Sequence, residues 1–350
     1  MASLRFGVRV PSFAWPELRY EDARSLATYC RRVEELGFDD IWALDHLLRA
    51  PALYDVAWLD PLAVLTYAAG VTERVGLGTA ALVLPIRHPV LLAKELATLQ
   101  HLSCGRAILG IATGWDDGEF RATGVPRTQR GARTDEALEL LGRLLAEKEV
   151  TFSGRFHQVE GITIYPRVPD PPPVWVAGGS LEHADETRDG PRIVPAVLRR
   201  LLGAQGWMSR SSGSDSTSVK RDWDEVRTNL TAHGRDPATL IFAHTQFVHV
   251  VETTDSEQAL QEQLPVFARV MGDHRSPADL AASYLLGTVE EIQERIADLA
   301  AVGLQYLILT PVSSDERQLE LLTKHLVAPF AEATAPTDHY ASEEEKQWEH

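Results

Sequence analysis

The sequence is poor in the residues that crosslink chains, track nucleic acids or cross membranes. Its 350 residues include only two cysteines, Cys30 and Cys104, and its 34 basic residues are outnumbered by 50 acidic ones. Both cysteines lie in apolar-periodic segments, so we expect reduced core thiols of a cytosolic protein and neither a disulfide nor a metal pair. An acidic chain without a basic block matches nucleic acid poorly, because that partner needs clustered Lys and Arg. No apolar run approaches the roughly 18 residues of a membrane span and residues 1–11 lack a secretion signal, so we expect a cytoplasmic protein without a membrane partner.

What the sequence does have is a regular alternation of strand and helix patterns. Apolar residues at every second position predict strands, and apolar residues three or four positions apart predict helices. Strands are expected at 4–11, 39–45, 75–84, 106–114, 173–179, 206–213, 240–251 and 306–311. Helices are expected at about 21–37, 60–71, 90–102, 131–145, 219–233, 256–269 and 288–303, with one more after the final strand. Residues 151–166 predict a short antiparallel excursion.

Eight strands, nearly all followed by a helix, predict an α/β fold of the (β/α)8 TIM barrel type. A doubly wound sheet accommodates five or six such units, but eight without a break in composition favour closure. Thr288 and Glu291 match a capping box at the start of one helix, and Gly303 marks its end. We expect a single domain over residues 1–332, with insertions at the C-terminal face of the barrel, and a charged tail over residues 333–350.

An acid and an imidazole stand side by side where the second strand ends, at Asp45 and His46. Active sites of (β/α)8 barrels lie at the C-terminal ends of the strands, so this position favours a catalytic role. The alternative is structural, with Asp45 capping a turn and His46 merely packing.

Small residues follow the third, fourth and fifth strands, in the sequences GTAA, ATG and AGGS. Their backbone can approach a flat or phosphorylated ligand closely, although ordinary turn chemistry explains any one of them. The serine-rich residues 208–218, with Arg210, predict either a phosphate cradle or a flexible linker. Trp58, Trp115 and Trp207 fall near the same strand ends, where they either wall an apolar pocket or only pack.

The chain lacks the sequence motifs of several other enzyme classes. Residues 76–81 fit a loose G-x-G-x-x-A dinucleotide pattern, but the apolar run continues to Leu84 and meets Pro85, so no helix opens there. The sequence contains no H-E-x-x-H metal motif and no G-x-S-x-G nucleophile elbow. A metal-dependent hydrolase or a serine hydrolase therefore has no support.

Five stretches carry a family likeness. They are GFDDIWALDHLL at 37–48, the run from DPLAVLT to IATGW at 60–115, EF..TGVP...RG.R.DEALELL at 119–141, PPPVWVAGGS at 171–180 and GTVEEIQERIADLAAVGLQYLIL at 287–309. Together they resemble the bacterial luciferase-like monooxygenase superfamily, and within it most of all the F420-dependent oxidoreductases. The likeness is colinear from about Arg5 to Phe330.

The resemblance implies a TIM barrel that binds F420 or reduced FMN at the C-terminal ends of its strands. It implies a non-prolyl cis peptide bond between Ala80 and Ala81, and it places His46, with Asp45 beside it, next to the cofactor ring as catalytic residues. We combine the positions that the resemblance indicates with the residues at the strand ends and around the expected pocket. The expected cofactor-binding residues are then Thr79, Ala80, Ala81, Thr113, Gly114, Gly178, Gly179, Ser180, Trp207 and Arg210. A homodimer is expected from the resemblance as well.

The expected function is oxidation or reduction of a small organic substrate by an F420- or FMN-dependent oxidoreductase. F420 implies hydride transfer, whereas reduced FMN implies monooxygenation through a flavin peroxide and a separate flavin reductase as partner. The Asp-His doublet, in place of the Glu-His-His run of luciferase-type oxygenases, favours F420. A non-catalytic flavin-binding barrel is the alternative of a different class.

Two departures from the resemblance bear on the substrate. Sugar-phosphate dehydrogenases of this superfamily carry a glutamate directly after the strand-four Thr-Gly, where this chain has Trp115. Sugar-phosphate oxidation is therefore not expected. The stretch 181–205 departs from the usual helix, so it is expected to cover the barrel mouth or to contact a second subunit.

Overall fold

The computed structural model describes residues 4–14, 19–180, 192–209 and 213–330. The expected tail at 333–350, the candidate Arg210 and residues 181–191 of the departing stretch lie outside this part of the chain.

Eight parallel strand positions close into a barrel, as the sequence predicts. The order is β10-β11-β12-β13-β1-β3-β5-β7, and pairing of β10 with β7 closes the circle. The third position is split into two pieces, β5 and β6, which both pair with β7. The barrel strands are β1 (Arg5–Arg9), β3 (Asp40–Ala43), β5 (Gly76–Thr79), β6 (Leu82–Val83), β7 (Ala107–Ala112), β10 (Val174–Ala177), β11 (Gly206–Met208), β12 (Ile241–Val248) and β13 (Tyr306–Pro311).

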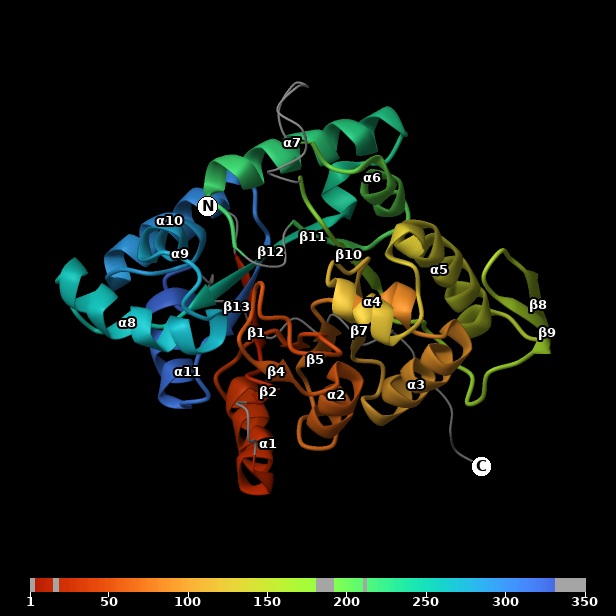
Figure 1. Cartoon of the computed structure of the whole chain (residues 1–350), viewed down its shortest axis with the longest axis horizontal. Helices are drawn as coiled ribbons and strands as arrows, with labels where there is room; N and C mark the ends of the chain where they lie inside the picture. Colours follow the sequence, from red (N-terminus) through yellow and green to blue (C-terminus); the bar gives the residue numbers. More distant parts are fainter. Residues whose placement is uncertain (1–3, 15–18, 181–191, 210–212, 331–350) are drawn as a thin grey trace, which may run out of the picture.

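Helices surround the barrel on its outside (Figure 1). Those that match the predicted segments are α1 (Tyr20–Glu35), α2 (Pro61–Ala69), α3 (Pro89–Leu102), α5 (Arg130–Ala146), α7 (Ser216–Ala232), α8 (Ser256–Met271), α10 (Val289–Val302) and α11 (Arg317–Leu322), which continues as a π-helical turn, η4 (Thr323–Val327). The capping box of Thr288 and Glu291 is present, and Gly303 ends α10 in the left-handed conformation. Three short helices were not predicted: α4 (Asp117–Ala122), α6 (Pro195–Leu201) and α9 (Pro277–Ser283).

Two small antiparallel sheets lie outside the barrel. The hairpin of β8 (Val150–Ser153) and β9 (Gln158–Ile162) is the predicted excursion, and it projects at the edge of the molecule beyond α5 (Figure 1). The pair β2 (Phe13–Ala14) and β4 (Ala57–Trp58) links the loops that follow β1 and β3. The turns η1 (Leu84–Ile86), η2 (Arg127–Gln129) and η3 (Pro237–Thr239) complete the elements.

Both faces of the barrel strands are buried, which a closed sheet requires. Outward residues such as Phe6 and Val8 join the large cluster beneath the helices. Inward residues such as Trp42, Met208 and Tyr306 form a separate cluster inside the barrel. The parity of a residue in its strand therefore decides whether it faces the helices or the barrel axis.

The two cysteines differ in environment. Cys30 is buried in α1, as predicted, and burial raises the pKa of its thiol to about 12. The prediction for Cys104 is wrong, because this residue is exposed in the turn after α3, with a φ of 53°. None of the helices in the described part of the chain combines the length and the apolar character that a membrane span needs.

Candidate active site

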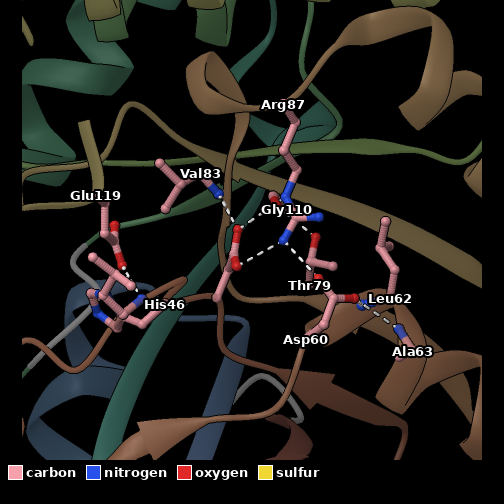
Figure 2. A network of polar contacts seen from close by, with 11 residues as sticks. His46, Asp60, Leu62, Ala63, Thr79, Val83, Arg87, Gly110 and Glu119 are labelled. Atoms are coloured by element: carbon pink, nitrogen blue, oxygen red, sulfur yellow. Dashed lines mark hydrogen bonds and ion pairs between the residues drawn. The ribbon is translucent and has the colours of Figure 1, made fainter. Parts of the chain in front are cut away.

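Asp45 and His46 follow the same strand, β3, but their side chains contact different neighbours. Both residues are buried, with 3% and 8% of their surface exposed. The Nδ1 atom of His46 lies 3.0 Å from Oε1 of Glu119. Figure 2 shows His46 and Glu119 facing each other on one side and Arg87 with Asp60 on the other, with Val83 between the two groups.

Glu119 is a site residue that the sequence analysis missed. It lies on α4 and is 1% exposed, and the backbone N–H of Leu48 also reaches its Oε1 at 3.4 Å. Because a carboxylate accepts hydrogen bonds, this contact favours a proton on Nδ1 of His46 and leaves Nε2 as the nitrogen available to a ligand. Asp116 caps α4 by accepting from the N–H of Glu119 at 2.9 Å. This Asp-x-x-Glu spacing is a helix-start pattern and was the one signal in the sequence for the helix.

Asp45 holds the loop beside the site and does not face His46. Its carboxylate accepts the backbone N–H of Val83 at 2.8 Å and pairs with Nη2 of Arg87 at 2.9 Å. Arg87 also reaches Asp60 at 3.0 Å, and Asp60 caps α2. Burial alone would lower the pKa of Arg87, but the two carboxylates raise it above its ordinary value.

The loop that Asp45 holds contains the expected cis peptide bond, between Ala80 and Ala81. Both alanines belong to the cluster inside the barrel and are nearly inaccessible. Thr79, just before them, donates from its Oγ1 atom to the carbonyl of Gly110 at 2.7 Å. The hydroxyl of Thr79 is therefore engaged with β7, and it is the small alanines that border the barrel mouth.

Four further predicted residues lie together on neighbouring strand ends. Register pairs Val83 with Ala112, and the parallel pairing of β7 with β10 continues toward Thr113 and Gly178. Thr113, Gly114, Gly178 and Gly179 are all half-buried. We call residues 80–83, 112–114 and 177–179 the strand-tip platform.

Gly114 is required where it stands on the platform. Its φ is +72°, and a Cβ atom there would lie 2.6 Å from Cγ1 of Val83. Since a φ in this range favours glycine, any larger residue would push the β6 end away from β7.

Ser180 and Trp207 are placed differently from the expectation of direct ligand contact. Ser180 is 5% exposed, donates its N–H to Asp222 at 2.8 Å and accepts from Nη2 of Arg221 at 3.2 Å. Trp207 is fully buried on the outer side of β11 and stacks with Trp223 and Phe242, which also stack on each other. The prediction that Trp207 lines a pocket at the barrel mouth is therefore wrong. Side chains alternate along β11, so Met208 points into the barrel and Trp207 points outward to the helices. The indole N–H of Trp207 donates to the carbonyl of Gly178 at 2.7 Å, so it supports the platform from behind.

Aromatic rings surround His46. Tyr54 and Trp115 meet its ring edge-on, with centroid distances of 5.5 and 5.7 Å. Trp115 is 37% exposed, and Leu47 beside His46 is 50% exposed. Trp58 is more buried than Trp115 and packs against Tyr54. Apart from the carboxylate of Glu119, these neighbours of His46 are aromatic or aliphatic. In the described part of the chain, no three or more His, Cys, Asp or Glu side chains are grouped to hold a metal ion.

The sequence model of the luciferase-like monooxygenases matches residues 4–190, which is more than half of the chain. The chain belongs to this family. It is 35% identical over 317 residues to an F420-dependent glucose-6-phosphate dehydrogenase of Beutenbergia cavernae, covering 84% of this chain and 89% of that protein.

Solved structures share the family fold at low sequence identity. Monooxygenase RslO1 from Streptomyces bottropensis superimposes with a TM-score of 0.77 and 23% identity over 94% of this chain and 100% of that one. An F420-dependent secondary alcohol dehydrogenase in complex with an F420-acetone adduct superimposes with a TM-score of 0.74 and 18% identity. The match covers 93% of this chain and 98% of that one.

Proposed function

We propose that this luciferase-like protein is an oxidoreductase that uses F420, or in second place reduced FMN, on a small organic substrate. The observation that carries the proposal is His46, fixed by Glu119 at a strand end beside the strand-tip platform. A family relative of similar length is F420-dependent, and for this reason we propose F420 ahead of FMN.

The platform suits a flat ring system. Apart from Leu82 and Val83 its side chains are small, its glycines are half-buried, and its three segments come from adjacent strands. A broad planar ligand needs such backbone that it can approach closely. In this proposal Ala80, Ala81, Thr113, Gly114, Gly178 and Gly179 hold the cofactor directly, whereas Thr79, Ser180 and Trp207 keep the platform in place.

Bound F420 would supply a hydride donor or acceptor, and bound FMN would supply oxygen chemistry. The protein's part is to place a proton. With Nδ1 of His46 directed at Glu119, Nε2 can take a proton from a substrate hydroxyl or return one to a carbonyl oxygen. The rings of Tyr54 and Trp115 exclude water from this transfer, and Glu119 stabilises the imidazole whenever it is charged.

The substrate is proposed to differ from that of the curated relative. In this chain Trp115 stands where the sugar-phosphate dehydrogenases carry a glutamate, and it adds an exposed apolar ring at 5.7 Å from His46. An indole offers no acceptor for a sugar hydroxyl and favours an apolar substrate. A homodimer, and a partner reductase if FMN is the cofactor, stay predictions.

The test is an anaerobic fluorescence titration of the purified protein with F420 and, separately, with reduced FMN. We expect saturable binding of F420, and we expect His46→Ala to bind it equally well while turnover falls about 100-fold or more, the usual contribution of a general acid or base. Preference for reduced FMN would indicate oxygen insertion. Binding of neither cofactor would contradict the proposal and favour a non-catalytic barrel.

A further inference from the structure

A buried arginine at the end of β1 takes no part in the site described so far. Arg9 is 1% exposed, yet its Nε, Nη1 and Nη2 atoms have no hydrogen-bond partner among the described residues. Arg106, which is 6% exposed, by contrast donates to Ser103, Val75 and Thr72 at 2.7 to 2.9 Å. Burying a charged group without partners is costly, so a guanidinium left in this state has its donors free for something else.

Among the described residues, the surroundings of Arg9 are aromatic and supply no carboxylate as a counter-charge. Its Cζ lies 5.7 Å from the ring centre of Phe247. Burial lowers the pKa of Arg9 to about 10, and the groups that oppose this shift are the phenols of Tyr54 and Tyr284, with no carboxylate among them. The side chain is therefore charged at neutral pH, and the part of the chain that the structure describes gives it no fixed anion.

Two hydroxyl groups beside Arg9 are also unpaired. Thr310 and Thr245 are 1% exposed, and the Oγ1 atom of each has no partner among the described residues. Register places Val8 beside Leu309 and Thr245 beside Ile308, so Arg9, Thr310 and Thr245 all project from the inner face of three neighbouring strands, β1, β13 and β12. Thr310 is thus level with Arg9 on the adjoining strand, and Thr245 lies two residues further from the barrel mouth on the same inner face.

We propose that Arg9, with Thr310 and Thr245, binds the carboxylate of an organic substrate whose apolar body packs against Phe247 and Tyr54. A guanidinium matches a carboxylate with two parallel hydrogen bonds, and a single cation balances a monoanion. The identification of the bound molecule as substrate rests on the proposed function.

The position of this site relative to His46 supports a substrate over a remote effector. Tyr54 is 5.7 Å from Phe247 and 5.5 Å from His46, measured between ring centres, so one ring borders both groups. The strand-tip platform uses β6, β7 and β10, whereas Arg9, Thr310 and Thr245 come from the other half of the barrel. A molecule anchored at Arg9 would therefore extend toward His46 across the half that the platform leaves free. Since the nitrogens of Arg9 are inaccessible, Tyr54 or Tyr284 must move when the ligand enters.

The experiment is calorimetric titration of the cofactor-free protein with benzoate, and with benzamide as a neutral molecule of the same shape. We expect benzoate to bind and benzamide to bind at least about 10-fold more weakly, as loss of a charge-assisted hydrogen bond predicts. Arg9→Met is expected to lose benzoate binding by about 10- to 100-fold, and Arg9→Lys to lose less. Arg121→Met, which removes an exposed arginine from α4, is the matched control and is expected to bind benzoate like the parent.

Equal binding of benzoate and benzamide, or unchanged benzoate binding in Arg9→Met, would overturn the inference. Tighter binding of inorganic phosphate than of benzoate would overturn the choice of a carboxylate. If Arg9→Met does not fold, Thr310→Val decides, because it keeps the shape and is expected to weaken benzoate about 3- to 10-fold by loss of one hydrogen bond.

Titrations of Arg9→Met with F420 and reduced FMN separate this inference from the proposed function. Unchanged cofactor binding is expected, and a variant that loses cofactor but keeps benzoate would contradict a substrate site. Arg9-dependent benzoate binding in a protein that binds neither cofactor would support the anion site and refute the proposed function.

Discussion

His46 depends on a residue that lies 73 positions further along the chain. Glu119 reaches it from α4, a helix of six residues that is held by the cap at Asp116. A buried carboxylate that accepts from Nδ1 fixes the orientation and the tautomer of an imidazole ring. At this scale Glu119 is a positioning residue, since it touches His46 and not the reacting atoms.

Glu119→Leu is therefore expected to lower kcat about 10- to 100-fold with little change in KM, and Glu119→Gln to lower it less. Glutamine still accepts a hydrogen bond from Nδ1, so it keeps the orientation and loses only the charge, whereas leucine loses both. Steady-state kinetics with the substrate found for the parent measure the split between kcat and KM. Asp117→Asn, an exposed change on the same helix, serves as the control.

Equal loss of activity in Glu119→Gln and Glu119→Leu would mean that orientation of His46 does not matter. A rise in KM at constant kcat would instead place Glu119 in substrate binding.

Sequence reasoning found His46 and missed Glu119 and Arg9 for different physical reasons. His46 follows a recognisable strand, and strand ends are where barrels carry chemistry. Glu119 is recognisable only once the chain between β7 and α5 is folded back over β3. Arg9 shares a face with Arg5 and Gly7 in an alternating strand, a pattern that indicates a solvated face; closure of the barrel buries that face instead.

The split strand β5–β6 is the element on which the platform depends. Its irregular link carries Ala80 and Ala81, and the ion pair of Asp45 with Arg87 connects it to β3 and, through Asp60, to α2. The side chain of Asp45 is 2% exposed, so its charge has no water to replace a lost partner. Breaking a buried pair by removing one partner leaves an uncompensated charge.

Arg87→Met is expected to destabilise the protein by about 3–5 kcal/mol, because it leaves Asp45 buried with only the N–H of Val83 as a strong partner. Asp60→Asn is the matched contrast, with an expected cost of under about 1 kcal/mol. Asparagine keeps the cap on α2, and the side chain of Asp60 is 49% exposed. Urea unfolding of the two variants measures the difference, and similar losses would show that the Asp45 pair does not hold the element.

Element types were predictable because the repeated strand and helix patterns are long and periodic. The short helices α4, α6 and α9 have six or seven residues each, too few for a clear period. The third strand was predicted as one run at 75–84, and its apolar composition gives no sign that two residues leave the ladder. Trp207 was misplaced for a related reason, since a strand of three residues offers little pattern from which to assign its two faces.

At the scale of the whole molecule, closure of the barrel joins the first barrel strand to the last. β1 pairs with both β3 and β13, which brings Asp40 and Tyr306 together inside the base of the barrel. The hydroxyl of Tyr306 donates to Asp40 and accepts from the indole of Trp42 at 3.2 Å. Arg5 lies 3.7 Å from the same carboxylate. Asp40 is 1% exposed, and burial raises its pKa from 3.8 to about 6, in spite of Arg5 and Tyr306.

This raised pKa makes global stability depend on pH in a defined direction. Folded Asp40 holds its proton more tightly than unfolded Asp40, so its contribution is full below pH 4 and is lost as the pH rises through about 6. The difference between the two pKa values corresponds to about 3 kcal/mol. Asp40→Asn does not titrate, so its stability relative to the parent is expected to rise by up to about 3 kcal/mol between pH 4 and pH 7, whatever constant cost the amide adds.

Urea-unfolding midpoints of the parent and Asp40→Asn across this range measure the effect. Tyr306→Phe is a second test. The hydrogen bond from the phenol lowers the pKa of Asp40, so its loss is expected to raise that pKa further. Stability should then continue to fall to a higher pH than in the parent. Parallel pH profiles for the parent and Asp40→Asn would show that Asp40 is ionised at little cost, with water reaching the base of the barrel. A divergence that builds up between pH 4 and about pH 6 and then stays constant would show instead that the closed barrel keeps this carboxylate dry, and that the base of the inner face, the face on which Arg9 also lies, is a low-dielectric interior.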